Sequence, residues 1–271
     1  KYNIPGPRYT SYPTVPFWKN QSFTNDAWLK SLSHSNLTEK RSLGLYIHLP
    51  YCESLCTFCG CHKRITKNHS VEQPYIDTVL SEWALYQAHL GTDLWIKELH
   101  LGGGTPTFFA PKEIVRLTKG LFAQQIIHPD TCDLSFEAHP GSTTSEHLKE
   151  LFEIGYRRVS FGIQDYDMQV QKAINRVQSI ALVQKVHREA KLLGYSINHD
   201  LVYGLPFQNL QGFSQTIDQT IALLPERIAL YGYAHVPWVK GTGQRGYSEE
   251  NLPKDAQKRA LYEMAYDKLL A

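Results

Sequence analysis

The stretch "LYIHLPYCESLCTFCGCHK", residues 45–63, joins a short apolar run to a dense cluster of cysteines. The run consists mainly of apolar and aromatic residues and ends at Pro50, which is typical of a buried strand. Four of the five cysteines of the chain then fall within ten residues: Cys52, Cys56, Cys59 and Cys61. The stretch therefore predicts a buried strand that leads directly into a thiol-rich loop.

Five further runs of this kind predict five more strands, and a segment with helical spacing follows each of the six. The strands are expected at residues 43–50, 96–103, 132–140, 156–164, 195–204 and 227–237. The helices are expected at residues 73–90, 111–124, 143–155, 180–194, 210–225 and 256–271. Strict alternation predicts a parallel sheet with helices outside it. We therefore expect an α/β fold, a partial (β/α)6 TIM-like barrel, with a doubly wound sheet as the alternative.

The limits of the chain and of one helix can also be read from the sequence. Thr143, three residues before Glu146, predicts a capping box, and Gly155 predicts the end of that helix. We assign residues 39–271 to the barrel and residues 1–38 to an N-terminal segment that packs over its mouth. The chain starts without Met and ends within a helical pattern, so we expect a piece of a longer protein.

Polar and reactive side chains collect where the predicted strands end. The cysteine loop follows the first strand, and "GGGTPT", residues 102–107, follows the second. Later strand ends carry Glu137, Gln164, Asp200 and Ala234 with His235. Because the carboxyl ends of parallel strands meet at one edge of a sheet, we expect a functional site there.

Composition and charge exclude some classes of protein. The chain has 271 residues, with 28 Lys and Arg against 26 Asp and Glu, so the formal net charge is only +2. A nucleic-acid-binding protein usually carries a strong basic excess. The sequence also has neither a membrane-length apolar run nor a signal-peptide core. We expect a cytoplasmic protein with reduced thiols, no nucleic-acid or membrane partner, and a packing role for Cys132.

The cysteine spacing C-x3-C-x2-C-x-C favours an iron–sulfur cluster over two alternatives. Disulfides are disfavoured by the compartment and by the short spans. Structural zinc usually takes two pairs of ligands that are far apart in sequence. Thiolates are the usual ligands of iron–sulfur clusters. If Cys52, Cys56 and Cys59 bind three irons and Cys61 points away from Cys59, a fourth iron stays open for a substrate or cofactor.

This C-x3-C-x2-C loop after the first strand, with "GGGTP" after the second, resembles the radical S-adenosylmethionine (SAM) enzymes. The resemblance implies a [4Fe–4S] cluster held by Cys52, Cys56 and Cys59, with SAM chelating the open iron. In that superfamily the reduced cluster cleaves SAM to methionine and a 5′-deoxyadenosyl radical, which removes hydrogen from the substrate. The protein orients the cofactor and excludes competing reactions.

Within the superfamily, seven motifs resemble the oxygen-independent coproporphyrinogen III oxidases. They are "PGPRYTSYPT" (5–14), "YIHLPYC" (46–52), "CGC" (59–61), "LGGGTPT" (101–107), "FGIQD" (161–165), "INR" (174–176) and "DLVYGLP" (200–206). The resemblance implies oxidative decarboxylation of two propionates of coproporphyrinogen III to vinyl groups, giving protoporphyrinogen IX in heme biosynthesis. It also implies a C-terminal domain that is absent here. We expect this piece to bind the cluster and SAM but to turn over coproporphyrinogen poorly.

The resemblance implies further roles for individual residues. It assigns SAM contacts to Tyr46, Phe58, Gly103, Gly104, Thr105, Glu137, Gln164, Arg176, Asp200 and Ala234. It makes His48, Cys61 and Glu137 candidate catalytic residues. Aromatic packing for Tyr46 and Phe58, a tight turn for the glycines, a solvated Arg176 and a structural hydrogen bond for His48 remain alternatives. His139 departs from the family, which often has an acidic residue there.

Two alternatives and several partners complete the expectations. The alternatives are a heme-binding chaperone relative of the same superfamily branch, which typically has an aromatic residue in place of Cys61, and a barrel stapled by zinc. The resemblance implies coproporphyrinogen III as substrate and a flavodoxin- or ferredoxin-like protein as electron donor. We expect a monomer.

Overall fold

The computed structural model describes residues 14, 17–18, 23–35, 42–91, 95–123, 132–237, 244 and 247–271. The motif at residues 5–14 lies outside this part except for Thr14, and so does most of the N-terminal segment of residues 1–38. Its predicted packing over the barrel mouth therefore stays a prediction. Helix α1 (Asn25–Ser35) lies near the last turn of α2 (Glu72–Leu90), where the Ser33 hydroxyl and His89 Nε2 are 2.8 Å apart.

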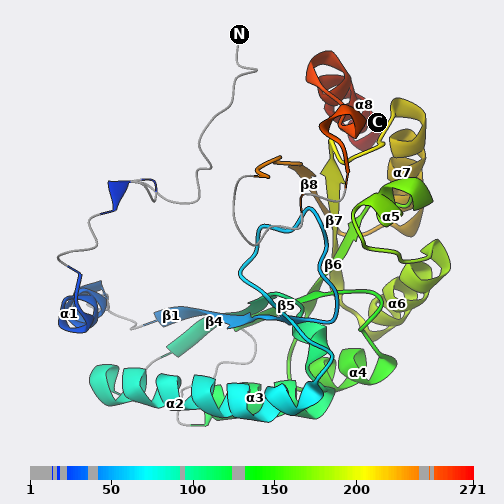
Figure 1. Cartoon of the computed structure of the whole chain (residues 1–271). Coiled ribbons are helices and arrows are strands. Elements are labelled where there is room, and N and C mark those ends of the chain that lie inside the picture. The colour runs from blue at the N-terminus through cyan, green and yellow to red at the C-terminus, as the bar shows by residue number, and fades with distance from the viewer. Residues whose placement is uncertain are drawn as a thin grey trace.

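The predicted six-stranded parallel sheet is confirmed. Its strand order is β1-β4-β5-β6-β7-β8, and every neighbouring pair is parallel. The strands are β1 (Ser42–Leu49), β4 (Trp95–Gly103), β5 (Asp133–Ala138), β6 (Arg158–Gln164), β7 (Ser196–Tyr203) and β8 (Arg227–Gly232). Because the spatial order follows the chain order, the sheet never reverses direction as a doubly wound sheet does. It curves instead into a partial barrel (Figure 1).

Helices follow the strands and cover the convex side of the sheet (Figure 1). They are α2, α3 (Pro111–Phe122), α4 (Ser145–Glu153), α5 (Met168–Ala173), α6 (Ile180–Leu193), α7 (Leu210–Leu223) and α8 (Asp255–Leu270). Helices α1 and α5 are additions to the predicted set. Short 3-10 turns lie at η3 (His69–Val71), η4 (Pro106–Phe108) and η5 (Glu249–Asn251). Among the described residues, no helix has the length and apolar character needed to cross a lipid bilayer.

The start of α4 differs from the sequence prediction by one residue. Thr144 is the N-cap, and its hydroxyl accepts a hydrogen bond from the backbone N–H of His147. The His147 ring accepts in turn from the Thr144 backbone N–H, at 3.2 Å from Nδ1. The predicted capping box of Thr143 and Glu146 was therefore wrong in position. Gly155, with φ of +107°, ends the helix as expected.

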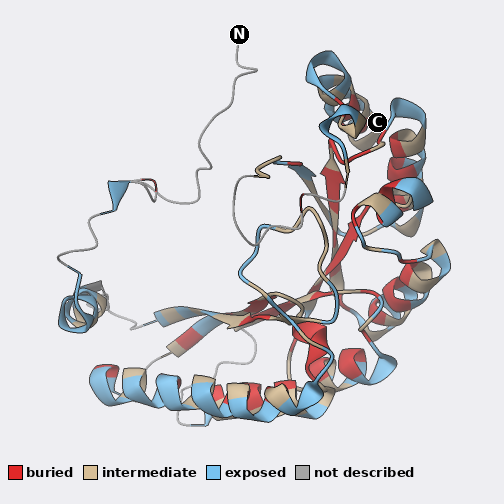
Figure 2. Ribbon diagram, in the orientation of Figure 1, coloured by how far each residue is buried: buried red, intermediate tan, exposed pale blue. Residues whose placement is uncertain are grey.

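The apolar core fills the layer between the sheet and its helices. Alternate strand residues such as Leu101, Phe136 and Phe161 are fully buried and belong to one cluster with helix residues such as Leu117 and Leu151. Figure 2 shows this buried layer along the strands and the inner helix faces. Because side chains alternate along a strand, the other face is free to carry polar groups. That concave face carries the candidate site.

Candidate functional site at the open side of the barrel

The cysteine loop follows β1 and is tied to the sheet at its base and to the turn after α5 at its tip. At the base, β2 (Tyr51–Cys52) pairs in parallel with β3 (Arg64–Ile65). At the tip, the Thr57 backbone N–H donates to the carbonyl of Ile174 at 2.9 Å. The Asn175 amide donates to the carbonyl of Leu55 at 2.8 Å. The loop is thus held at its base and at its tip, and it lies in the concave side of the barrel (Figure 1).

Two of the predicted cluster ligands contact residues that the sequence also singled out. The Cys52 Sγ lies 3.2 Å from the hydroxyl of Thr105, and the Arg176 guanidinium donates to the Cys56 Sγ at 3.6 Å. Burial raises the pKa of the Cys52 thiol, and the nearby Cys59 and Cys56 add to this effect. The structure therefore brings the loop, the "GGGTPT" turn and Arg176 together. Arg176 is not a solvated surface arginine.

Cys61 does not diverge from Cys59, and the sequence prediction on this point was wrong. The two thiols interact, and this interaction lowers the pKa of Cys59 and raises the pKa of Cys61. Residues two apart in an extended chain project to the same side, which accounts for the contact. The Lys63 ammonium holds the turn by donating to the carbonyls of both cysteines at 3.3 Å.

The glycines at the end of β4 allow the cysteine loop to approach the sheet. A Cβ at Gly104 would lie 2.5 Å from the carbonyl oxygen of Pro50, which no side chain tolerates. Gly103 has φ of +117°, a conformation that favours glycine, and its N–H donates to the Glu137 carboxylate at 3.2 Å. Close approach of the cysteine loop at Gly104 and the positive φ of Gly103 thus account for these two glycines without a ligand.

Aromatic and acidic groups of β1, β4 and β5 meet beside the loop. Tyr46 stacks on His100 with ring centroids 5.9 Å apart, and its hydroxyl lies 3.1 Å from His48 Nδ1. His100 Nε2 lies 3.6 Å from Glu137. The structural hydrogen bond considered for His48 is present, since its Nε2 lies 2.8 Å from the carbonyl oxygen of His62. His100 was missed by the sequence analysis. It lies two residues before Gly102 in β4, and residues two apart in a strand lie on the same face.

Arg176 and Gln164 meet at the end of β6. The Arg176 guanidinium donates to the Gly162 carbonyl at 2.7 Å, while its Nε is buried without a partner among the described residues. Gln164 is nearly buried and has φ of +68° where the pairing with β7 shifts register. A left-handed conformation costs a non-glycine residue free energy, and such strain often occurs at functional sites.

Asp200 is held by two polar residues that the sequence analysis missed. The Ser160 hydroxyl donates to its Oδ2 at 2.9 Å, and the Asn198 amide donates to its Oδ1 at 2.8 Å. Burial raises the pKa of Asp200, and these two hydrogen bonds act in the opposite direction. Both partners lie on the same face of the sheet as Asp200. Asn198 is in the same strand, β7, and Ser160 is in the neighbouring strand, β6. Their alternation with buried residues is the signal that could have identified them.

The end of β8 completes the rim. The Gln244 amide donates to the carbonyl of Ala234 at 3.0 Å and to that of Phe58 at 3.5 Å. Phe58 also packs against the small apolar cluster that contains Leu205 and Tyr233. Aromatic packing is therefore observed for Phe58, and Ala234 and the cysteine loop lie near each other.

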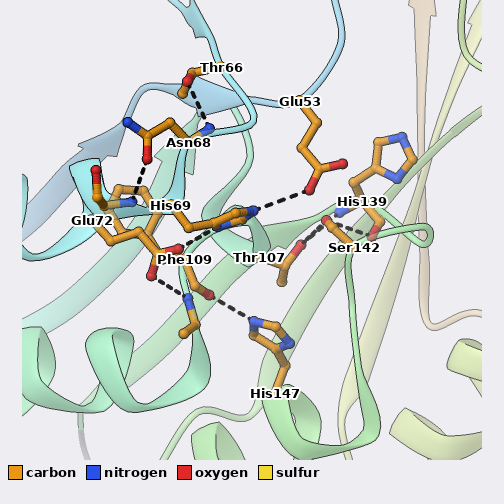
Figure 3. A network of polar contacts seen from close by, with 12 residues as sticks. Glu53, Thr66, Asn68, His69, Glu72, Thr107, Phe109, His139, Ser142 and His147 are labelled. Atoms are coloured by element: carbon orange, nitrogen blue, oxygen red, sulfur yellow. Dashed lines mark hydrogen bonds and ion pairs between the residues drawn. The ribbon is translucent and has the colours of Figure 1, made fainter.

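A polar network behind the loop fixes its first residues (Figure 3). The buried Glu72 accepts from the Ala110 N–H at 2.8 Å and pairs with His69 at 2.6 Å. The other nitrogen of His69 lies 3.5 Å from Glu53, next to Cys52 in sequence. The hydrogen bond to Glu72 raises the pKa of His69. His139, which stands where the family often has an acidic residue, lies nearby. Burial lowers the pKa of His139 to about 3, so its ring is neutral.

Comparison with known proteins decides the family. The family model of the radical SAM superfamily matches residues 46–220. The chain belongs to the radical SAM superfamily. This membership implies a [4Fe–4S] cluster and SAM as cofactors.

Several curated relatives and one solved structure share almost the whole chain. The oxygen-independent coproporphyrinogen III oxidase of Helicobacter pylori strain J99 is 41% identical over 97% of this chain, and that of Pseudomonas aeruginosa PAO1 is 36% identical over 100%. The structure of the Escherichia coli coproporphyrinogen III oxidase HemN, a radical SAM enzyme, has a TM-score of 0.90 at 32% identity and covers 97% of this chain. The chain spans 58% of the Helicobacter relative, 59% of the Pseudomonas relative and 59% of the HemN chain.

The residues present fit the cofactors of a radical SAM protein. Three thiols lie on one anchored loop, with the Arg176 cation and the Thr105 hydroxyl as partners. Among the described residues, no group of three or more Cys, His, Asp or Glu side chains is arranged to hold one metal ion.

Proposed function

We propose that this chain carries out the oxygen-independent oxidative decarboxylation of coproporphyrinogen III. Two propionates become vinyl groups, and the product is protoporphyrinogen IX. The observation that carries this proposal is the anchored three-cysteine loop at the carboxyl ends of the strands, in a chain that matches the named oxidases over nearly its full length. The heme-chaperone alternative has no comparable support.

In this proposal the protein holds its cofactors with the loop and the strand ends. Cys52, Cys56 and Cys59 hold the cluster. When bound, the reduced cluster and SAM would supply the one-electron chemistry that removes a hydrogen atom from the β-carbon of a propionate. The carboxylate would then leave as CO2, and an electron acceptor would take the remaining electron.

The other strand-end residues bind and orient SAM. Gly103, Gly104 and Thr105 present the backbone to the methionine part, and Ala234 contacts the adenine. Glu137, Gln164, Arg176 and Asp200 are the polar contacts, and Tyr46 and Phe58 are the aromatic ones. The hydrogen bonds that fix Asp200 support this role, because a largely buried charge without partners is costly. Glu137 is half-exposed and accepts a hydrogen bond from the Gly103 N–H at the same rim.

His48, Cys61 and Glu137 lie where a substrate group would meet the cofactors. We propose that Cys61 and His48 contact the substrate or hold a proton during its reaction. A flavodoxin- or ferredoxin-like protein is the proposed donor of the reducing electron. The cytoplasmic location and the monomeric state stay predictions.

Anaerobic reconstitution with iron and sulfide tests the proposal. We expect cluster-loaded protein to form 5′-deoxyadenosine from SAM with dithionite. When coproporphyrinogen III is added, it should release CO2 and protoporphyrinogen IX only slowly, because the chain spans 58% of the Helicobacter relative. Formation of 5′-deoxyadenosine without any decarboxylation would contradict the substrate. A colourless protein that retains zinc and no iron would contradict the cofactors as well.

A further inference from the structure

A cavity of about 180 Å³ lies in the concave face, mostly along the first halves of the strands. It is therefore below the rim that holds the cysteine loop and Asp200. Its lining residues come from five neighbouring strands: His100, Ser135, Phe136, Arg158, Val159, Ser160, Ser196, Asn198 and Arg227. Whole-ligand pockets usually measure about 300–1,000 Å³, so this cavity suits one small group rather than an entire cofactor.

The lining is rich in hydrogen-bond donors and contains two guanidinium groups. Within these described lining residues there is no carboxylate. Some donors are already used: Asn198 and Ser160 donate to Asp200, as described above. The side chains of Ser196 and Arg227 have no hydrogen-bond or ion-pair partner within the described part of the chain. Free donors of this kind suit an anion.

The balance of charge points the same way. Arg158 is paired with Asp133 through two contacts, Nε to Oδ1 at 2.8 Å and Nη2 to Oδ2 at 2.7 Å. This pair is neutral as a unit and leaves the Nη1 N–H groups of Arg158 available. Arg227 is exposed to solvent and has no ion-pair partner among the described residues, so its guanidinium is the cation of the cavity that is available to an anion. An anion of one charge would therefore neutralise it.

The position of the cavity connects it to the proposed reaction site. Asn198 is paired in register with Arg227, and Ser196 with Arg158. Asp200 follows two residues after Asn198 on the same strand face, about 7 Å further along β7. A group bound in the cavity thus lies directly beneath Asp200. A large ligand anchored there would extend upward along the concave face toward the cysteine loop.

We propose that this cavity binds one carboxylate of the substrate, with Arg227, Ser196 and Arg158 as its donors. The inference rests on the proposed function, because coproporphyrinogen III is a tetracarboxylate whose propionates would supply the anion. The guanidinium of Arg227 forms the charged hydrogen bonds, Ser196 adds a neutral one, and the Arg158–Asp133 pair fixes the wall between them. Anchoring one propionate positions another edge of the macrocycle at the rim.

Binding of coproporphyrin III, the fluorescent oxidised form of the substrate, tests this site directly. The titration is done on cluster-loaded protein with SAM present. A hydrogen bond to a charged group contributes about 1.5–3 kcal/mol, so we expect Arg227→Gln to raise Kd roughly 10- to 100-fold. Arg227→Lys should restore part of the affinity, and Ser196→Ala should raise Kd about two- to tenfold. Iron content and Tm verify that the variants fold.

Lys149→Gln is the matched control, because it removes one exposed positive charge on α4, on the convex side of the barrel. Its Kd should equal that of the parent protein. Equal Kd values for the parent protein, Arg227→Gln and Ser196→Ala would overturn the inference and leave the proposed function intact. An equal loss of affinity in Lys149→Gln and Arg227→Gln would overturn it too, since the effect would then be general electrostatics. Parent protein that cleaves SAM but does not bind coproporphyrin III would instead contradict the proposed substrate.

Discussion

Arg176 connects the cysteine loop to the sheet through a single side chain. One of its terminal nitrogens donates to the Cys56 sulfur, the other donates to the Gly162 carbonyl, and its Nε stays buried without a partner among the described residues. A buried donor without an acceptor costs free energy, so an additional acceptor at this position would be favourable. The proposed SAM carboxylate is such an acceptor.

We therefore expect Arg176→Gln to weaken SAM binding about 10- to 100-fold and to speed the loss of iron from the loaded protein. The reason is the loss of charged hydrogen bonds, each of which contributes about 1.5–3 kcal/mol. Equilibrium dialysis with SAM and the rate of iron release to a chelator measure the two effects. Arg188→Gln, an exposed change on α6, is the control. Parent-like values for both quantities in Arg176→Gln would rule out this role.

A buried histidine pair makes stability depend on pH. His187 Nδ1 and His199 Nε2 are 3.1 Å apart between α6 and β7. Burial lowers the pKa of both, that of His199 to about 3. The unfolded chain therefore takes up protons below about pH 6.5 that the folded chain does not, and stability falls as the pH decreases from about 6.5 toward 3.

His199→Asn should reduce this pH dependence. Each such histidine contributes up to about 1.4 kcal/mol per pH unit, so the slope of unfolding free energy against pH should decrease by about one proton. Urea denaturation at several pH values between 7.5 and 4.5 measures the slope in parent and variant. The lost His187–His199 contact changes the unfolding free energy by the same amount at every pH, so it does not affect the slope. An unchanged slope would mean that the pair does not titrate in this way.

At the scale of elements, the cysteine loop depends on the turn between α5 and α6. Asn175 has φ of +52°, a left-handed conformation that Asn tolerates better than most residues, and its amide holds the Leu55 carbonyl. The Thr57 backbone N–H and hydroxyl make two more bonds to this turn. Three hydrogen bonds thus fix the tip of a loop that has little secondary structure of its own.

Asn175→Ala should loosen this loop. The variant loses one hydrogen bond and the residue type suited to a positive φ, a combined cost of about 1–3 kcal/mol. We expect faster trypsin cleavage after Lys63 and Arg64 in the cluster-free protein, followed by mass spectrometry. Asn209→Ala, which removes the N-cap of α7, is the control because it costs about 1 kcal/mol elsewhere. Equal cleavage rates in the two variants would show that the turn does not hold the loop.

Several elements could be predicted because their signals are local. The six strands and their following helices come from apolar runs and helical spacing, and the strand ends then place Glu137, Gln164 and Asp200 on one rim. The helix cap at α4 was misplaced because Thr143 and Thr144 both suit an N-cap, and His147 takes the part usually played by Glu or Gln. The choice between two such residues is made by packing.

At the scale of the whole molecule, the contacts that complete the site could not be read from the sequence. His100 beside Glu137, and Ser160 beside Asp200, depend on the register between strands, which a single sequence does not determine. The barrel fold therefore determines where the candidate site lies, and the register between strands determines which side chains meet there.

The central claim is that three thiols hold a cluster with one iron open to SAM. It is tested by iron and sulfide content, together with dithionite-driven 5′-deoxyadenosine formation, in single Cys-to-Ala variants. Cys52→Ala, Cys56→Ala and Cys59→Ala should each lose most of the cluster and all measurable SAM cleavage. Cys61→Ala should keep its iron, and Cys132→Ala should match the parent in both measurements. Loss of iron from Cys61→Ala as complete as from the other three loop variants would show that every iron has a protein ligand, and would contradict the account.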